Sequence, residues 1–474
     1  MNKIIKTKIS YLYALILISS SAFAEIKLPA IFGNNMVLQQ QSEVSIWGTA
    51  EKNATVKVVT SWNDKKYSTK ASDDGRWKLK VATPTAGGPY DVTISDGKAL
   101  KLENVLIGEV WVCSGQSNMQ MPMKGFNNQP VIGSLEAILT SPNATIRFFS
   151  VGLDASLTPL EDFKGKWDVC NQETTEKFSA TAYFFGRMLQ ETLRVPIGLI
   201  HSSWGGTAIE PWMSEGNCKE FDFIKMVKET PFPKNPPKAP ASLYNAMIHP
   251  MVGYGIRGAI WYQGESNRFE PERYQKLLPA MIKDWRNKWE VGDFPFYYVQ
   301  IAPHGKSDLL PNGAFLREAQ LNASTAISNV GMACILDLGE QNNIHPANKE
   351  IGSKRLAYLA LSQTYAIKGI NPFSPTMKAM TIKNDTVRLT FNNAPNGLTS
   401  YGKELSLFEL AGADKKFYPA KATITATGII VKSESVQQPV AARYAFKNFI
   451  MGDLFGTNGL PVSSFRTDDW EREK

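Results

Sequence analysis

Histidine and cysteine are both scarce in this chain, with four residues of each among 474. Four cysteines are too few for disulfides to be the main stabilisation of a chain of this length. The histidines and cysteines do not fall at the spacings of a zinc site, and no dinucleotide-binding or phosphate-cradling glycine pattern follows the first long strand. The sequence therefore offers no recognisable site for a metal ion or a nucleotide cofactor.

The charge and the distribution of apolar residues argue against two further classes of protein, those that bind nucleic acid and those that span a membrane. The formal net charge of +8 is mild, and the basic residues are scattered, which argues against a nucleic-acid partner. Three lysines within the first eight residues precede an apolar run ending in Ala22-Phe23-Ala24, which is typical of a secretory signal peptide over residues 1–24. The alternative is a membrane anchor, but the run is shorter than the roughly 20 apolar residues that a spanning helix needs. We expect cleavage before Glu25, export to the periplasm or beyond, and no stable membrane insertion.

The cysteines divide into two kinds of context. Cys113 and Cys334 stand inside apolar, strand-like runs, where we expect small core residues. A disulfide between Cys170 and Cys218 is an open alternative for the other two.

Three regions follow the signal. Residues 25–105 and 371–474 consist of short alternating runs separated by turn residues, which predicts an N-terminal β-sandwich and a C-terminal β-rich region. Residues 106–370 alternate apolar runs with segments of helical spacing, which predicts an α/β domain with a parallel sheet and helices on both faces. The strand candidates are VLIGEVWVCS, TIRFFSV, PIGLIHSSW, IRGAIWYQG, PFYYVQIAP and GMACILDLG.

Polar residues gather where these apolar runs end. Such sheets bind ligands beyond the carboxyl ends of their strands, so we expect the functional site there. The first run ends in CSGQSNMQ, the third in SSWGGT and the fourth in QGESN, while His345 follows the last run on a loop that enters a helix. Ser117, Gly206, Gln263 and His345 would then meet at one edge.

A serine needs a neighbouring base to become a nucleophile. Of the four histidines, His345 has the best position to reach Ser117 from another loop. Taken singly, Ser117 could serve as a turn or cap residue and His345 as a neighbour of a helix cap. The surrounding loops favour catalysis, because Gly206 and Gln263 could supply hydrogen-bond donors to the oxyanion of an acyl-transfer reaction. Alternatively, Gly206 could belong to a tight turn after the strand, and Gln263 could form hydrogen bonds within its own turn. Met119 occupies the place where a nucleophile elbow requires glycine, which excludes the ordinary α/β-hydrolase motif.

Several motifs together resemble a known family, the SGNH hydrolases, and within them the sialate O-acetylesterases and related carbohydrate acetylesterases. The motifs extend over nearly the whole chain beyond the signal. They are LPAIFGNNMVLQQ, WVCSGQSNMQMP, FSATAYFFGRML, GLIHSSWGGTAIEPW, AIWYQGESN, IHPANKEIGSKRLA and GLPVSSFRTDDW. The resemblance implies a flavodoxin-like sheet flanked by helices.

The resemblance also implies residue roles. Ser117 would be the nucleophile and would donate its own N–H to the oxyanion, with Gly206 and Gln263 as the other donors, and His345 would be the base. Gln116, Asn118 and Glu265 would contact the substrate or support the site.

The family pattern often has an aspartate three residues before the histidine, where this chain has Asn342. We therefore consider Asn342 or the backbone carbonyl of Asn343 as the group that orients His345, with Glu340, Asp337 and Glu265 as carboxylate alternatives.

The resulting hypothesis is a serine esterase that removes O-acetyl groups from a glycan through an acetyl-enzyme, without a cofactor. Sialic acid is the favoured substrate, and its carboxylate would call for a nearby arginine. Acetylated xylan or another polysaccharide is the alternative substrate. A non-catalytic glycan-binding protein, in which aromatic residues such as Trp47, Trp62 and Trp77 stack on sugars, is the alternative class. The sequence does not indicate an oligomeric state.

Overall fold

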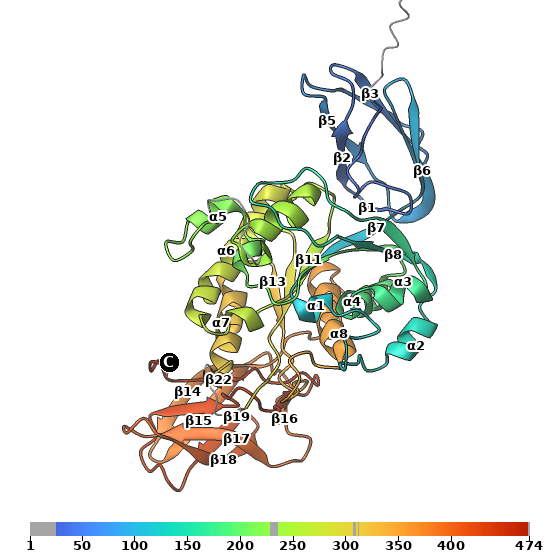
Figure 1. Ribbon diagram of the computed structural model, residues 1–474. Helices are drawn as coiled ribbons and strands as arrows, with labels where there is room; N and C mark the ends of the chain where they lie inside the picture. The colour runs from blue at the N-terminus through green and yellow to red at the C-terminus, as the bar shows by residue number, and fades with distance from the viewer. Residues whose placement is uncertain (1–24, 228–235, 307–309, 311, 473–474) are drawn as a thin grey trace, which may run out of the picture.

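The computed structural model describes residues 25–227, 236–306, 310 and 312–472. Figure 1 shows three parts in chain order, with a β region at the N-terminal end, a central α/β part and a second β region at the C-terminal end. The expected signal peptide lies outside the described residues. Within them, no helix has the length and apolar character that crossing a membrane requires.

A single long strand links the first two parts. β7 (Ala99–Gly115) begins in the N-terminal β region and ends in the central sheet, so it crosses the boundary expected near residue 105. Its first half pairs antiparallel with β6 (Gly87–Ser95), and its second half pairs in parallel with β10 (Ile197–Ser203) and β11 (Gly258–Tyr262). The buried part of β7 reads as one apolar run because both of its faces are covered.

The central sheet has the order β13-β12-β11-β7-β10-β8-β9. All of its neighbouring strands are parallel except the pair of β8 and β9. The chain builds outward from β7 on one side and then on the other, which makes the end of β7 a topological switch point. The strands not yet delimited are β8 (Asn143–Ser150), β9 (Trp167–Cys170), β12 (Phe296–Val299) and β13 (Val330–Ala333).

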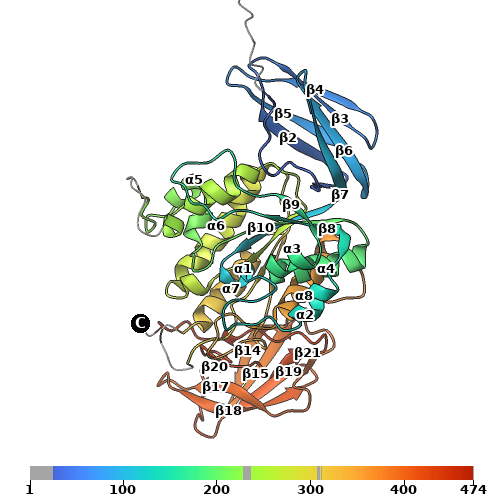
Figure 2. The same cartoon turned by 45° about the vertical axis from the view of Figure 1, so that its right-hand side comes forward.

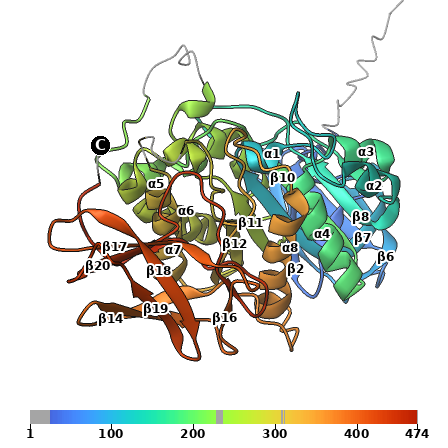
Figure 3. The ribbon, with the colours of Figure 1, turned by 90° about the horizontal axis from the view of Figure 1, so that it is seen from below.

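Helices cover both faces of this sheet, as predicted. α6 (Pro271–Trp289) and α7 (Ala314–Ala326) share one apolar cluster with Val110 and Val112 of β7. α4 (Ala180–Leu193) and α8 (Lys349–Leu359) share the other with Trp111 and Cys113 of the same strand. Figure 3 shows the two helix pairs on opposite sides of the strands. The remaining α-helices are short: α1 (Ser117–Gln120), α2 (Ser134–Leu139), α3 (Gln172–Lys177) and α5 (Glu215–Lys219).

The N-terminal region contains no helix among residues 25–105. β2 pairs with β5, while β3 pairs with β4 and β6, and alternate residues of these strands are buried between the two layers. β1 joins β7 in parallel and ties the region to the central sheet. The bounds are β1 (Val37–Gln39), β2 (Glu43–Thr49), β3 (Thr55–Thr60), β4 (Lys66–Lys70) and β5 (Arg76–Ala82).

The C-terminal region is also all β. Its main sheet has the order β14-β15-β19-β18-β17-β20-β22, and β16 pairs with β21. In Figure 2 this region lies at the opposite end of the molecule from the N-terminal strands. Its strands are β14 (Thr376–Lys383), β15 (Thr386–Asn392), β16 (Leu398–Thr399), β17 (Leu405–Ala411), β18 (Phe417–Thr425), β19 (Gly428–Lys432), β20 (Ala441–Tyr444), β21 (Phe455–Gly456) and β22 (Phe465–Arg466).

All four cysteines are buried and free. Cys113 and Cys334 are core residues, as expected, and the alternative of a Cys170–Cys218 disulfide is wrong. The Cys170 thiol lies 3.0 Å from the backbone oxygen of Ser141, and burial raises its pKa to about 11. These thiols therefore act as small apolar residues.

The first prediction concerns Gly115, the last residue of β7. It has a φ of +141°, and a Cβ there would lie 2.2 Å from the backbone oxygen of Tyr262. Gly115→Ala should lower the free energy of unfolding by about 1 to 3 kcal/mol or more. The added methyl group would force the backbone to move away from this φ angle and from the Tyr262 oxygen. Urea titration measures this change, with Gly216→Ala as the control, since Gly216 has open space around it. An equally stable Gly115→Ala protein would contradict the prediction.

Candidate active site

Four loops meet at the carboxyl edge of the central sheet. They follow β7, β10, β11 and β13 and together line a cavity of about 460 Å³. Ser117, Gly206 and His345, which the sequence analysis selected from three of these loops, all line this cavity. The complete lining is Gln116, Ser117, Gly206, Glu265, Ser266, Arg268, Phe269, Ile344 and His345.

Ser117 is the first residue of α1, directly beyond the end of β7. Among the described residues, neither its hydroxyl nor its backbone N–H has a hydrogen-bond partner. The first N–H groups of a helix lack intrahelical acceptors, so this one is free to bind a ligand atom. The side chain is partly exposed to the cavity.

The loop after β10 places Gly206 opposite Ser117. Gly206 has a φ of +71°, which glycine adopts at little cost, and a Cβ there would meet nothing within 4 Å. Its neighbour Gly205 donates its N–H to Gln120 Oε1 at 2.8 Å, which fixes the loop to α1. The N–H of Gly206 has no partner within the described part of the chain, so it is a second available donor.

His345 is held by a turn that the sequence analysis did not select. Its Nδ1 lies 2.5 Å from Gln129 Oε1, and Phe126 packs edge-on against the imidazole with the ring centroids 5.4 Å apart. Phe126 and Gln129 exchange two backbone hydrogen bonds of 3.0 Å, so the turn is rigid. A carbonyl oxygen accepts only from a protonated Nδ1, which leaves Nε2 as the basic nitrogen.

None of the residues expected to orient His345 forms a hydrogen bond to its ring among the described residues, where Nδ1 binds Gln129. Asn342 is exposed and has no hydrogen bond to any described residue. Asn343 accepts the backbone N–H of His345 at 3.0 Å and donates to Glu340 Oε2 at 3.1 Å. The three carboxylate alternatives have other partners: Asp337 pairs with Arg355, Glu340 accepts the N–H of Ala347, and Glu265 accepts from Asn118.

Gln263 does not line the cavity. Its two amide N–H donors are used by the backbone oxygen of Thr207 at 3.2 Å and by Asn267 Oδ1 at 2.7 Å. Asn267 Oδ1 also accepts the N–H of Ile209, which fixes it as an acceptor. The structure therefore places the Gln263 amide under the loop of Gly206, rather than at the position of an oxyanion donor.

Asn118 and Glu265 form a network beneath the cavity. Asn118 Nδ2 donates to Glu265 Oε1 at 2.6 Å and to the backbone oxygen of Ile344 at 3.1 Å, while its Oδ1 accepts from Lys349 Nζ at 2.6 Å. Burial raises the pKa of Glu265 and lowers that of Lys349 to about 7. Asn118 is thus a connector between loops, and Glu265 also faces the cavity.

Gln116 and Ser203 each form a contact near the cavity. Gln116 Oε1 accepts the N–H groups of Gly264 and Ser266, both at 3.4 Å, and joins the first loop to the third. Ser203 Oγ lies 2.6 Å from His201 Nε2, so these two residues form a serine–histidine pair outside the cavity lining. Ser203 is only 2% exposed, so substrate cannot reach it.

Arg268 and Phe269 were not selected from the sequence, although they directly follow QGESN. Arg268 is the only arginine or lysine that lines the cavity, and it has no ion pair with a described residue. Its guanidinium lies 5.1 Å from the centroid of the Phe269 ring, which is itself 58% exposed. The rim of the cavity therefore combines a cation with an apolar surface.

This fold and this cavity define an esterase of the SGNH type. The model of a family described as carbohydrate esterase, sialic acid-specific acetylesterase, matches residues 107–361. The chain belongs to this family and is a carboxylic ester hydrolase.

Known relatives agree with this placement. The sialate O-acetylesterase of Homo sapiens is 31% identical over 386 residues, which cover 74% of this chain and 73% of that protein. The sialate O-acetylesterase of Mus musculus is 29% identical over 496 residues, covering 90% of this chain and 91% of its own. The crystal structure of a carbohydrate acetylesterase from Xanthomonas citri superposes with a TM-score of 0.86 at 33% identity, covering 94% of this chain and all of that one.

The second prediction follows from the electrostatics of His345. Burial lowers its pKa to about 4, and the positive charges of Lys349 and His304 act in the same direction. The imidazole is therefore neutral down to this pH. If it accepts the proton of Ser117 as expected, activity should be lost only below this pH, where the ring becomes protonated. The acid limb of kcat/KM for 4-nitrophenyl acetate should lie well below pH 6.5.

The variant Gln129→Glu tests the same pH dependence by placing a carboxylate next to His345 Nδ1. A carboxylate at Nδ1 favours imidazolium, so the acid limb should move upward by roughly one to three pH units. A wild-type limb at or above pH 6.5, or a limb that does not move in Gln129→Glu, would contradict the assignment of Nε2 as the base.

Proposed function

We propose that this protein removes O-acetyl groups from a glycan by a two-step serine mechanism. Ser117 Oγ attacks the acetyl carbon while His345 Nε2 accepts its proton, and the same proton then passes to the departing sugar oxygen. Water, activated by His345, hydrolyses the acetyl-Ser117 ester and releases acetate. The observation that carries the proposal is that Ser117, His345 and two free backbone donors face one cavity.

The N–H groups of Ser117 and Gly206 would bind the oxyanion. Both lack protein acceptors among the described residues, so they need not break a bond to bind it. Gln263 supports this arrangement indirectly, because it holds the backbone oxygen of Thr207 next to Gly206. Gln129 takes the place of the usual carboxylate and fixes the ring without adding a negative charge.

Arg268 favours sialic acid as the substrate. The carboxylate of a sialic acid can accept two hydrogen bonds from a guanidinium, and Arg268 offers an uncommitted guanidinium at the cavity. The names of the human and mouse relatives agree with this choice. A carbohydrate acetyl ester without a carboxylate is the second candidate, because Glu265 faces the same cavity and the Xanthomonas citri relative is named only as a carbohydrate acetylesterase.

Residues 1–24 support a further proposal, that the protein is exported to the periplasm or beyond the cell. Their three lysines, apolar run and small-residue ending fit a cleavable leader.

The third prediction tests the nucleophile. Ser117→Ala should lower acetate release from 4-nitrophenyl acetate by at least roughly 10⁴-fold, because the proposed mechanism has no other nucleophile for the acetyl group. Circular dichroism should show an unchanged fold. Ser203→Ala is the matched control, since it removes a serine that contacts His201 and does not line the cavity. Residual turnover within tenfold of wild type in Ser117→Ala would reject the mechanism.

The fourth prediction tests the substrate. Arg268→Gln should lower kcat/KM for an O-acetylated sialic acid by roughly 10- to 200-fold, which corresponds to losing a charged hydrogen bond of about 1.5 to 3 kcal/mol. Turnover of 4-nitrophenyl acetate, which has no carboxylate, should change less than twofold. Arg388→Gln in the C-terminal β region is the control. Equal losses on both esters, or a wild-type preference for acetylated xylan fragments, would favour a neutral substrate.

A further inference from the structure

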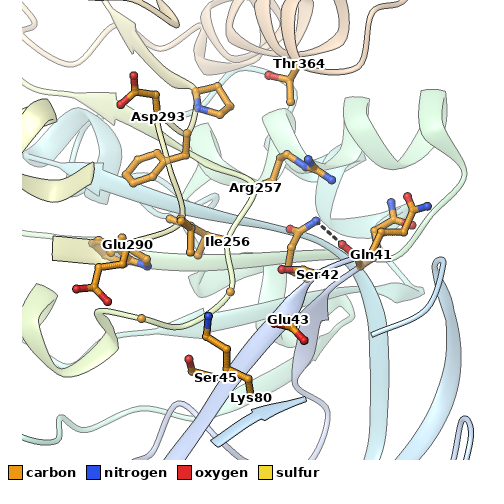
Figure 4. Close-up of a pocket in the computed structure, with 18 of the residues that line it drawn as sticks. Gln41, Ser42, Glu43, Ser45, Lys80, Ile256, Arg257, Glu290, Asp293 and Thr364 are labelled. Carbon is orange, nitrogen blue, oxygen red and sulfur yellow. Dashed lines mark hydrogen bonds between the residues drawn. The ribbon is translucent and has the colours of Figure 1, made fainter. Parts of the chain in front are cut away.

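Two larger cavities lie between the N-terminal β region and the central domain, far from Ser117. One has a volume of about 570 Å³ and is lined by residues of β2, β5 and the segments before β11 and β12. The other has a volume of about 550 Å³ and contains Trp47 and Trp77. Lys78 lines both, and they adjoin at Val252 and Gly253, so we treat them as one feature, the junction cleft. Figure 4 shows the first of the two cavities.

The junction cleft lies at the edge of the central sheet opposite the esterase cavity. Arg257 precedes β11, Pro295 precedes β12 and Asn329 precedes β13, and all three line it. The esterase cavity follows the carboxyl ends of the strands. Since β11 alone is five residues long, the two features are separated by at least roughly 17 Å. The cleft is therefore not an extension of the catalytic site.

The walls of the cleft are fixed rather than hinged. β7 runs through both regions, and a Cβ on Gly255 would lie 2.7 Å from Val44 Cγ1, so the two walls are in close contact. Beneath the cleft, Glu109 accepts hydrogen bonds from Arg257 Nε at 2.6 Å, Gln40 Nε2 at 2.6 Å and Tyr365 Oη at 2.9 Å. Such a satisfied network keeps the floor rigid and the cleft preformed.

Several charged side chains of the lining, of both signs, form no ion pair with a described residue. Glu43, Lys78, Lys80, Glu290 and Asp293 line the first cavity, and none forms an ion pair with a described residue. Interspersed acids argue against a phosphate or another polyanion, and no group of three metal-ligating side chains occurs among the described residues. A lining that offers hydrogen-bond donors and acceptors but little net charge suits a neutral, hydroxyl-rich ligand.

The second cavity adds an aromatic surface. Trp47 is partly exposed there, with Leu28 and Trp77 beside it, and Phe32 packs edge-on against it at a centroid distance of 4.6 Å. The indole N–H of Trp47 has no acceptor among the described residues. An indole with one apolar face and one free donor matches a sugar ring, which presents a C–H face surrounded by hydroxyls.

We propose that the junction cleft binds a neutral oligosaccharide segment of the glycan whose acetyl groups Ser117 removes. The sugar stacks on Trp47, and its hydroxyls bind Lys78 and the polar residues of the first cavity. Binding at a second point raises the effective concentration of a long substrate at the enzyme. This inference rests on the glycan substrate of the proposed function, but it assigns a site that takes no part in the chemistry.

Binding by a full-length Ser117→Ala protein tests the inference. Isothermal titration uses two unacetylated probes, xylohexaose and a neutral galactose–N-acetylglucosamine hexasaccharide, which represent the two sources of a neutral chain. At least one probe should bind, and adding Trp47→Ala or Lys78→Ala should weaken that binding at least tenfold. Tyr401→Ala is the matched control, because Tyr401 is an aromatic residue 62% exposed in the C-terminal β region.

Kinetics separate this site from the esterase cavity. In an otherwise wild-type chain, Lys78→Ala and Trp47→Ala should leave kcat/KM for 4-nitrophenyl acetate within twofold. In the same variants, KM should rise at least fivefold for an acetylated polymer that has the same sugar backbone as the probe that binds. Failure of both probes to bind, or binding that both variants leave intact, would overturn the inference. If the proposed function were wrong, the enzyme would not deacetylate glycans. The binding of the unacetylated probes does not depend on that reaction, so the two failures can be distinguished.

Discussion

The carboxamide of Asn118 joins the loops on which the esterase site depends. It stands next to Ser117 and contacts Glu265 from the loop after β11 and the backbone of Ile344, beside His345. Its oxygen accepts from the buried Lys349 of α8. All three hydrogen bonds come from one side chain that is 1% exposed, so the serine and the histidine loop cannot shift independently. The parallel sheet brings the loops to one edge, and this amide fixes their spacing.

Neutral groups perform tasks that charged groups often perform in such sites. Gln129 holds the imidazole through an amide oxygen, and Gln116 links the first and third loops through another. The ionisable residues Glu265 and Lys349 both bind the amide of Asn118, and burial moves the pKa of each toward its neutral form. The site can therefore keep His345 unprotonated, but it gives weaker support to the imidazolium that the proposed reaction would form.

The sequence was sufficient to predict those residues of the site that stand directly after the strands of the central sheet. The six apolar runs became β7, β8 and β10 to β13, and their polar ends brought Ser117, Gly206 and His345 to one cavity. Gln129 could not be predicted, because it lies in a surface turn with no periodicity and meets His345 only through tertiary packing. Gln263 was placed at the correct strand end, but the direction of an amide depends on acceptors such as Asn267 that the sequence does not locate.

The central claim is that Ser117 and His345 act on one acyl group across the edge of the sheet. A crystal structure of the protein after reaction with a phosphonate ester, which mimics the tetrahedral intermediate, tests it most directly. We expect phosphorus bonded to Ser117 Oγ, a phosphonyl oxygen within about 3 Å of the N–H groups of Ser117 and Gly206, and His345 Nε2 facing Oγ. Phosphorus on another residue, or an imidazole that turns Nδ1 toward Ser117, would contradict it.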